Sequence, residues 1–158
     1  MKRIILFVTA LFAALSLPAQ QQMRTEKNSD VIRTVTVEGD FVVVGGGLAG
    51  VCAAVSAARH GVPTVLVQDR PVLGGNASSE MRMGICGAKS AQDYEAGILE
   101  EMQLRNFRYN PLQRYTLWDD AIYSTVIMEP DIRLLLNTSV NGVVMDGDRI
   151  EAVEAWKT

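Results

Sequence analysis

Two residue types that carry much of enzyme chemistry are scarce in this chain, which has one histidine and two cysteines among its 158 residues. The single histidine, His60, ends a predicted helix, where it can complement the helix dipole, and it cannot serve a Ser-His-Asp triad. Cys52 and Cys86 are too few and too far apart for an iron–sulfur cluster or a clustered metal site. The two thiols could pair, but we favour the interpretation that each is a small buried apolar residue.

The sequence also has no excess of positive charge, because 15 Lys and Arg residues face 18 Asp and Glu residues, for a net charge of −3. Affinity for the phosphate backbone of nucleic acids comes from a basic surface, so a nucleic-acid partner is not expected. Apolar residues make up 48% and charged residues 21% of the chain, which is ordinary for one globular domain with a real core.

Long apolar runs are absent apart from one at the start, over Ile4–Leu17, which follows the basic pair Lys2 and Arg3. The run is shorter than the roughly 20 residues that a bilayer core requires. A basic start, an apolar centre and the small residue Ala19 are typical of a secretory signal peptide, which we assign to residues 1–19. We therefore expect an exported protein, periplasmic or extracellular in a bacterium. We expect no membrane contact after cleavage, and the net charge of the mature chain would then be −5 (−3 − 2).

The rest of the sequence alternates between strand and helix patterns, which predicts an α/β fold with a parallel sheet and a β-hairpin. Residues 20–30 are polar and without period, and they are interpreted as a flexible leader before a domain over 31–158. The expected strands are 31–38, 41–44, 65–67, 132–136, 140–145 and 150–156, and the last two flank the turn Asp146-Gly147-Asp148. The expected helices are 48–59, 90–106 after a capping box at Ser90–Asp93, and 117–128 with Asp119 and Asp120 in its first turn.

A glycine motif of the form G-x-G-x-x-G stands between the strand 41–44 and the helix 48–59, at Gly45, Gly47 and Gly50. In a Rossmann-like βαβ unit the first glycine permits a tight turn, the second lets the backbone approach a pyrophosphate, and the third allows close helix packing. The N–H groups and the dipole at the helix N-terminus favour the phosphate charge. The residues expected to line this phosphate site are Gly45, Gly46, Gly47, Leu48, Ala49 and Gly50.

The position that binds the ribose departs from the usual pattern. An Asp or Glu is expected at the end of the second strand, about 20 residues after the glycines, but this chain has Gln68 followed by Asp69. Either Gln68 accepts one ribose hydrogen bond through its amide oxygen, or Asp69 turns inward to do so. Arg70, which a 2′-phosphate would require nearby, lies beyond the strand end.

A second glycine loop follows in the run Arg70-Pro71-Val72-Leu73-Gly74-Gly75-Asn76. Together with the βαβ unit, it resembles the N-terminal FAD-binding region of oxidoreductases of the glutathione-reductase type. The wider stretch 74–82 resembles FAD-dependent oxidoreductases that are distantly similar to heterodisulfide reductase. The resemblance covers residues 40 to about 156 and implies FAD as cofactor. It also implies that Gly74, Gly75 and Asn76 run beside the FAD and that Val140 lies near the adenine.

Several features of those relatives are missing. The redox-active cysteine pair and the iron–sulfur cysteines are absent, so disulfide reduction and cluster electron transfer are not expected. Asn76, Ser78, Ser79 and Arg82 lie in the loop nearest the expected flavin, and each is either a flavin contact or an ordinary turn residue. These patterns identify no catalytic residue, and no metal site is expected.

The resulting expectation is the N-terminal FAD-binding portion of an exported FAD-dependent oxidoreductase that acts on an unidentified small molecule. The domain over 31–158 is then a partial FAD- or NAD(P)-binding domain, and the remainder of the chain is expected after Thr158. Two alternatives stay open, a non-catalytic nucleotide-binding remnant and an NAD(P)-dependent dehydrogenase domain.

Overall fold

A computed structural model describes residues 24–28, 32–87 and 96–158, so the predicted signal peptide over 1–19 lies outside the described residues. The chain divides into two compact units, Met1–Val37 and Glu38–Thr158. In the first unit, β1 (Arg24–Asn28) pairs antiparallel with β2 (Ile32–Thr36). We expected no regular structure over 20–30, and β1 is a correction. Its polar sequence has no strand period, but the β-branched strand β2 supplies hydrogen-bonding partners for its backbone.

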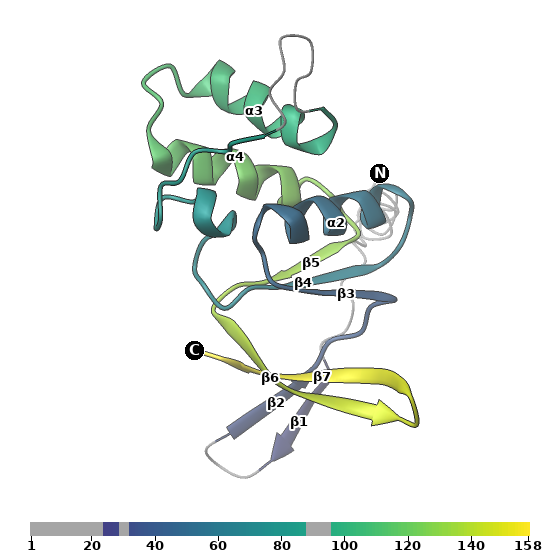
Figure 1. The fold of residues 1–158 in the computed structure, drawn as a ribbon. Coiled ribbons are helices and arrows are strands. Elements are labelled where there is room, and N and C mark those ends of the chain that lie inside the picture. Colours follow the sequence, from purple (N-terminus) through teal and green to yellow (C-terminus); the bar gives the residue numbers. More distant parts are fainter. Residues whose placement is uncertain (1–23, 29–31, 88–95) are drawn as a thin grey trace, which may run out of the picture. The chain divides into compact units, whose positions relative to one another are not determined.

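The second unit is built on a parallel sheet of three strands in the order β3-β4-β5, seen near the centre of Figure 1. The strands are β3 (Phe41–Val44), β4 (Thr64–Val67) and β5 (Ile132–Leu135), and every residue of the central strand β4 is buried. The helix α2 (Leu48–Arg59) connects β3 to β4. This arrangement confirms the predicted βαβ unit and the α/β fold class. The apolar run of β4 forms a buried central strand, as is typical of a parallel sheet. The apolar run of β3 instead forms an edge strand, in which only Val43 is buried.

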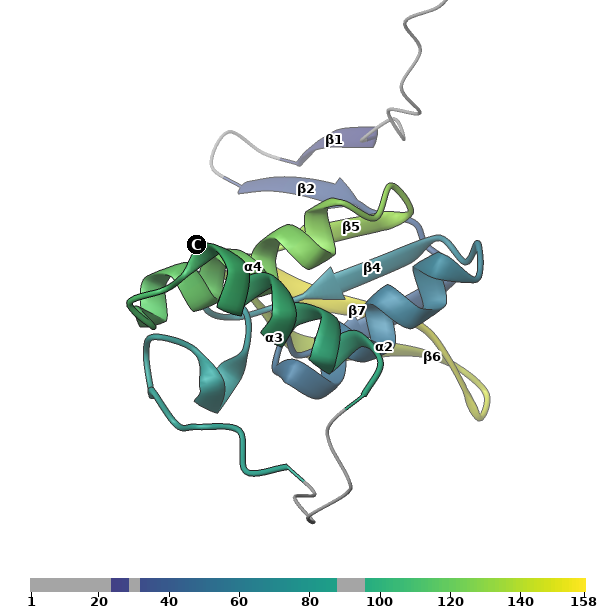
Figure 2. The same ribbon diagram turned by 90° about the horizontal axis from the view of Figure 1, so that it is seen from above.

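Helices cover one face of this sheet (Figures 1 and 2). The helices α2 and α4 (Tyr115–Ile127) contact the strands, and α3 (Ile98–Tyr109) packs on both helices. The core between them is apolar, and its fully buried members include Val51, Val55, Leu66, Met102 and Ile122. None of the helices in residues 24–28, 32–87 and 96–158 combines the length and apolar character needed to cross a bilayer.

Two helix boundaries differ from the prediction. The helix expected over 90–106 begins at Ile98 after Gly97 and continues to Tyr109, and the proposed capping box at 90–93 lies outside the described residues. The helix expected from Leu117 begins at Tyr115, so Asp119 lies beyond its first turn. The helix-dipole explanation for Asp119 is therefore wrong, and its contacts have to explain its place.

The predicted hairpin is confirmed as β6 (Thr138–Asp146) and β7 (Arg149–Lys157), joined at Gly147 with a φ of +58°. Its start is attached to the sheet, because the Thr138 N–H donates to the carbonyl of Gln68 at 2.9 Å. Most of the hairpin beyond this attachment is exposed.

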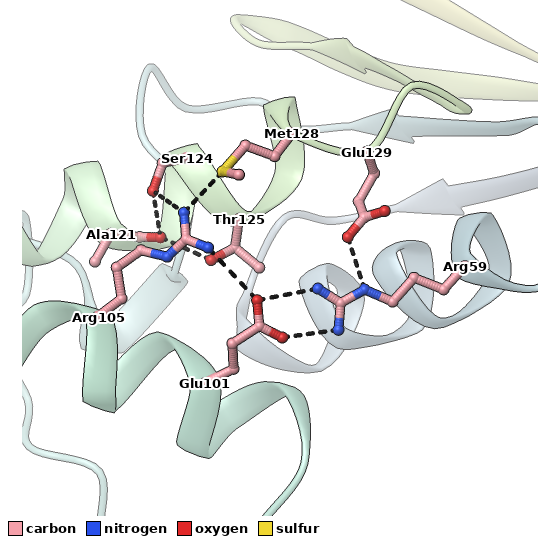
Figure 3. A network of polar contacts seen from close by, with 8 residues as sticks. All are labelled: Arg59, Glu101, Arg105, Ala121, Ser124, Thr125, Met128 and Glu129. Atoms are coloured by element: carbon pink, nitrogen blue, oxygen red, sulfur yellow. Dashed lines mark hydrogen bonds and ion pairs between the residues drawn. The ribbon is translucent and has the colours of Figure 1, made fainter.

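Charged side chains connect the end of α2 with α3 and with the segment that follows α4 (Figure 3). Arg59, at the end of α2, donates to both carboxylate oxygens of Glu101 on α3 at 2.8 and 3.0 Å. It also donates to Glu129 after α4 at 2.7 Å. The hydrogen bond from Arg59 lowers the pKa of the Glu101 carboxyl, and the same partners raise the pKa of Arg59. One guanidinium therefore joins three helical segments.

Candidate functional site

The first glycine loop turns sharply out of β3 into α2. Gly45 has a φ of +108°, a conformation that L side chains rarely adopt, and its N–H donates to Val67 on β4 at 2.8 Å. Gly47 is the residue before the first turn of α2. The N–H groups of Leu48 and Ala49 donate to no other group among the described residues, as is usual for the start of a helix. The helix thus presents free donors at the glycine loop.

The glycines of this loop differ in what surrounds them. A Cβ added at Gly50 would stand 1.9 Å from the carbonyl oxygen of Gly45, and one at Gly46 would stand 2.5 Å from the side chain of Leu73. A Cβ at Gly47 would meet nothing within 4 Å. Gly46 and Gly50 are therefore required by the protein's own packing, whereas the missing side chain of Gly47 leaves free space beside the helix N-terminus.

The structure brings the second glycine loop directly against the first. The Gly74 N–H donates to the carbonyl of Gly46 at 2.8 Å, and Gly47 and Gly74 form a parallel β-bridge. A Cβ at Gly75 would lie 3.3 Å from the Cα of Gly47. The chain then makes one 3-10 turn, η1 (Gly75–Ala77). Two glycine segments some 30 residues apart in sequence thus form one surface without side chains between them.

Gln68 is buried beneath this surface, with 5% of its surface exposed. Its Oε1 accepts the Gly46 N–H at 2.7 Å, and its Nε2 donates to the carbonyl of Val72 at 3.2 Å. Both ends of the amide are therefore bonded to the backbone of the segments around the two loops. Asp69 is exposed, and the exposed Arg70 pairs with Glu80 at 3.5 Å.

The polar residues of the second loop have different environments. Ser78 is fully buried and donates from Oγ to the Gly75 carbonyl at 2.7 Å, which identifies it as a turn residue of the loop itself. The Ser79 N–H donates to Oδ1 of Asp119 at 2.9 Å, and Arg82 donates to the Ser79 carbonyl at 3.1 Å. Asn76 is exposed beside Gly75.

Asp119 departs from what the sequence indicated, whereas the expectation for Val140 stays a prediction. Asp119 is a loop anchor that sequence reasoning missed, since its partner Ser79 lies 40 positions away. Val140, the expected adenine neighbour, is half-buried on β6, two residues after the hydrogen bond between Thr138 and Gln68.

Both cysteines are free thiols. Cys52 is half-buried against the core, and burial raises the pKa of its thiol. Cys86 is exposed after the second glycine loop, so the prediction that it is a small buried residue is wrong.

A parallel strand, a glycine turn, a helix with free N-terminal donors and a second parallel strand define a dinucleotide-binding α/β unit. The chain belongs to the FAD dependent oxidoreductase family, whose model matches residues 40–158. FAD is therefore the cofactor of this unit, as the second glycine loop indicated.

Solved structures of other proteins resemble the chain at low identity. A GidA-related protein from Thermus thermophilus is 20% identical with a TM-score of 0.46, over 73% of this chain and 45% of that one. A geranylgeranyl bacteriochlorophyll reductase-like protein from Thermoplasma acidophilum is 18% identical with a TM-score of 0.47, over 74% and 34%. An L-proline dehydrogenase from P. horikoshii is 15% identical with a TM-score of 0.47, over 75% and 49%. The chain therefore spans less than half of the length of each of these proteins.

Proposed function

We propose that this chain is the FAD-binding portion of an exported oxidoreductase that uses the flavin to oxidise or reduce a small substrate. The observation that carries the proposal is the direct backbone contact of Gly74 and Gly75 with Gly47, beside the free space that Gly47 leaves at the N-terminus of α2. A pyrophosphate requires such a close approach of backbone, together with the N–H donors and the dipole of a helix start. Bound FAD would supply the hydride or electron transfer, and the protein would supply orientation and electrostatics.

The residues of the proposed phosphate site have three roles: they donate hydrogen bonds, shape the turn or line the opposite wall. Leu48 and Ala49 present the free N–H groups, and Gly47 leaves the space in which an oxygen can reach them. Gly46 and Gly50 shape the turn and leave no free space of their own, whereas a Cβ at Gly45 would meet nothing within 4 Å. Gly74, Gly75 and Asn76 would line the opposite wall.

The proposed ribose contact is Asp69 rather than Gln68. Both polar ends of the buried Gln68 amide are already bonded to the protein backbone, so its role is to hold Gly46 and Val72 in place. Asp69 is the next residue, it is exposed, and its carboxylate can accept hydrogen bonds from ribose hydroxyls. Arg70, which pairs with Glu80, remains a proposed FAD contact, and Val140 remains the proposed neighbour of the adenine.

The test is FAD uptake by protein expressed from the complete reading frame and compared with its Gly47→Ser variant. Serine is a favoured residue before a helix, so this variant is expected to fold at least as well as wild type. Its Cβ and hydroxyl would fill the free space beside the helix start. We expect yellow wild-type protein with flavin absorbance bands and a variant that binds FAD at least tenfold more weakly, about 1.4 kcal/mol.

Gly84→Ser is the matched control, because a Cβ there also meets nothing within 4 Å and Gly84 is outside the proposed FAD contacts. A colourless wild-type protein that takes up no FAD on refolding would contradict the proposal. Release of the nucleotide by denaturation identifies it, and NAD(P) in place of FAD would favour a dehydrogenase.

Export is proposed from the pattern of residues 1–19 alone. Cell fractionation should find the mature protein, beginning near Gln20, outside the cytoplasm. Replacing Leu11 and Leu15 by Arg, in the middle of the apolar run, should leave the protein in the cytoplasm with its N-terminus uncleaved.

A further inference from the structure

One face of α4 contacts the second glycine loop. The residues Tyr115, Trp118, Asp119 and Ile122 are spaced at i, i+3, i+4 and i+7, which places them on one side of a helix. Each of them meets a residue between Gly74 and Arg82. The first two turns of α4 therefore contact the loop at four positions between Gly74 and Arg82.

Three of these contacts lie along the loop on either side of Ser79, the partner of Asp119. Trp118 is buried, and its Nε1 donates to the Ala77 carbonyl at 2.9 Å. The hydroxyl of Tyr115 donates to the Arg82 carbonyl at 2.8 Å. Ile122 lies so close to Gly74 that an added Cβ there would stand 2.8 Å from its Cδ1. These contacts fix the beginning, the middle and the end of the loop.

Asp119 supplies the charged contact. It is 9% exposed, and its Oδ1 accepts the backbone N–H of Ser79 at 2.9 Å. Placing a carboxylate in so buried a position costs free energy unless hydrogen bonds compensate for the lost water. The compensating bond goes to the loop that continues from Gly74 and Gly75, and these two glycines lie on the first glycine loop.

We propose that Asp119 is a positioning residue for FAD, which holds Ser79, and through it Gly74 and Gly75, against the first glycine loop. Asp119 acts through the loop and not by touching the cofactor. The inference rests on the proposed function, because it requires that the two loops together receive the FAD pyrophosphate. It assigns part of the cofactor affinity to a residue far outside both glycine motifs.

The experiment measures the dissociation constant of FAD by fluorescence titration of apoprotein made from the complete reading frame. Asp119→Ala removes the acceptor for Ser79 and should weaken FAD binding roughly tenfold to a hundredfold. Asp119→Asn keeps an amide oxygen in the same position, and we expect it to restore the affinity to within about threefold of wild type. Asp120→Ala, at the exposed neighbouring residue, is the control and should bind FAD as wild type does.

A role in general stability alone would give a different result. It would lower the thermal midpoint of the Asp119→Ala apoprotein and leave the FAD dissociation constant of the folded fraction unchanged. Trypsin cleavage after Arg82 reports directly on the loop, and we expect it to be faster in Asp119→Ala than in wild type or Asp119→Asn.

The outcomes separate the two proposals. If wild-type protein binds no FAD, the proposed function is wrong, and the inference is overturned with it. If wild type binds FAD and Asp119→Ala binds it equally well, only the inference is overturned. Should Asp119→Ala fail to fold, Tyr115→Phe removes the hydroxyl bonded to Arg82 with little disturbance of the core. It should then weaken FAD binding about two- to fivefold, and unchanged affinity in that variant would also overturn the inference.

Discussion

The two glycine loops meet at one surface, but they are held in different ways. The first loop, 45–50, is shaped by its own βαβ unit through Gly45 and Val67, and Gln68 lies 22 residues from its partner Gly46. The second loop, 74–82, is held from α4, and its partners Trp118 and Asp119 are 41 and 40 residues distant from Ala77 and Ser79. One half of the site is therefore local in sequence, and the other depends on a remote helix.

This difference has a consequence for how the site can fail. Damage to the first loop should come from changes inside the glycine motif, where added atoms meet backbone. Damage to the second loop should come from changes in α4 that leave the motif intact. Substitutions in both places test whether the two loops are as separate as their contacts indicate.

The largest effect is expected from Trp118→Ala, which removes a buried aromatic side chain and its bond to the Ala77 carbonyl. Loss of such a side chain costs about 3–5 kcal/mol, measured as the free energy of unfolding in urea. Trp118→Phe keeps most of the volume and leaves the carbonyl without its donor, for a smaller loss of about 1–3 kcal/mol. Equal losses in the two variants would show that the hydrogen bond, and not the packing, anchors the loop.

A matched pair of serine variants addresses the first loop. Gly50→Ser places a Cβ 1.9 Å from the Gly45 carbonyl oxygen, so the helix must shift, with an expected loss of about 1–3 kcal/mol. Gly47→Ser meets no protein atom within 4 Å and should change stability by less than about 0.5 kcal/mol. Thermal unfolding of the two apoproteins measures both values. A destabilised Gly47→Ser would mean that this glycine serves the fold and not only a ligand.

The ion pair between Arg59 and Glu101 lies away from both loops, so Glu101→Gln should leave FAD affinity unchanged and lower stability slightly. Because both side chains remain more than a third exposed, solvent screens the pair, and we expect a loss of no more than about 1 kcal/mol at pH 7. The pKa of Glu101 is lowered in the folded protein. Its contribution is therefore present above its ordinary pKa of 4.5 and is lost as the pH falls through the lowered folded value.

Thermal midpoints at pH 7 and pH 3 test this sign. The difference between wild type and Glu101→Gln, about 2–4 °C per kcal/mol for a chain of this size, should shrink in acid. A difference that grows in acid would contradict the assignment of the lowered pKa to the ion pair.

The smallest effect concerns the thiols, and it reports on exposure in the two regions. Cys86 follows the second loop and is exposed, whereas Cys52 lies in α2, where burial raises the pKa of its thiol. Since the thiolate is the reactive form, an aromatic disulfide reagent should modify Cys86 in a fast phase and Cys52 in a slow one. The fast phase should vanish in Cys86→Ser, and its survival there would reverse the assignment.

Much of the fold could be predicted because its signals are short in range. The apolar run 41–44, the glycines that follow it and the helix 48–59 define the βαβ unit from consecutive residues, and Asp146-Gly147-Asp148 defines the hairpin turn. The strand β1 could not be predicted in the same way. Its polar residues acquire strand structure only through the pairing with β2.

The amino-acid sequence by itself determined the first glycine loop, because the motif lies within six consecutive residues, 45–50. FAD followed from the resemblance of the second glycine loop, 70–76, to FAD-binding oxidoreductases. Only the tertiary structure decided what Gln68 and Asp119 do. An amide or a carboxylate binds whichever backbone group the fold brings near, and the residues next to it in the sequence do not indicate which group that is. Gln68 therefore holds Gly46 and Val72 from within, and Asp119 reaches Ser79 from a helix 40 residues away.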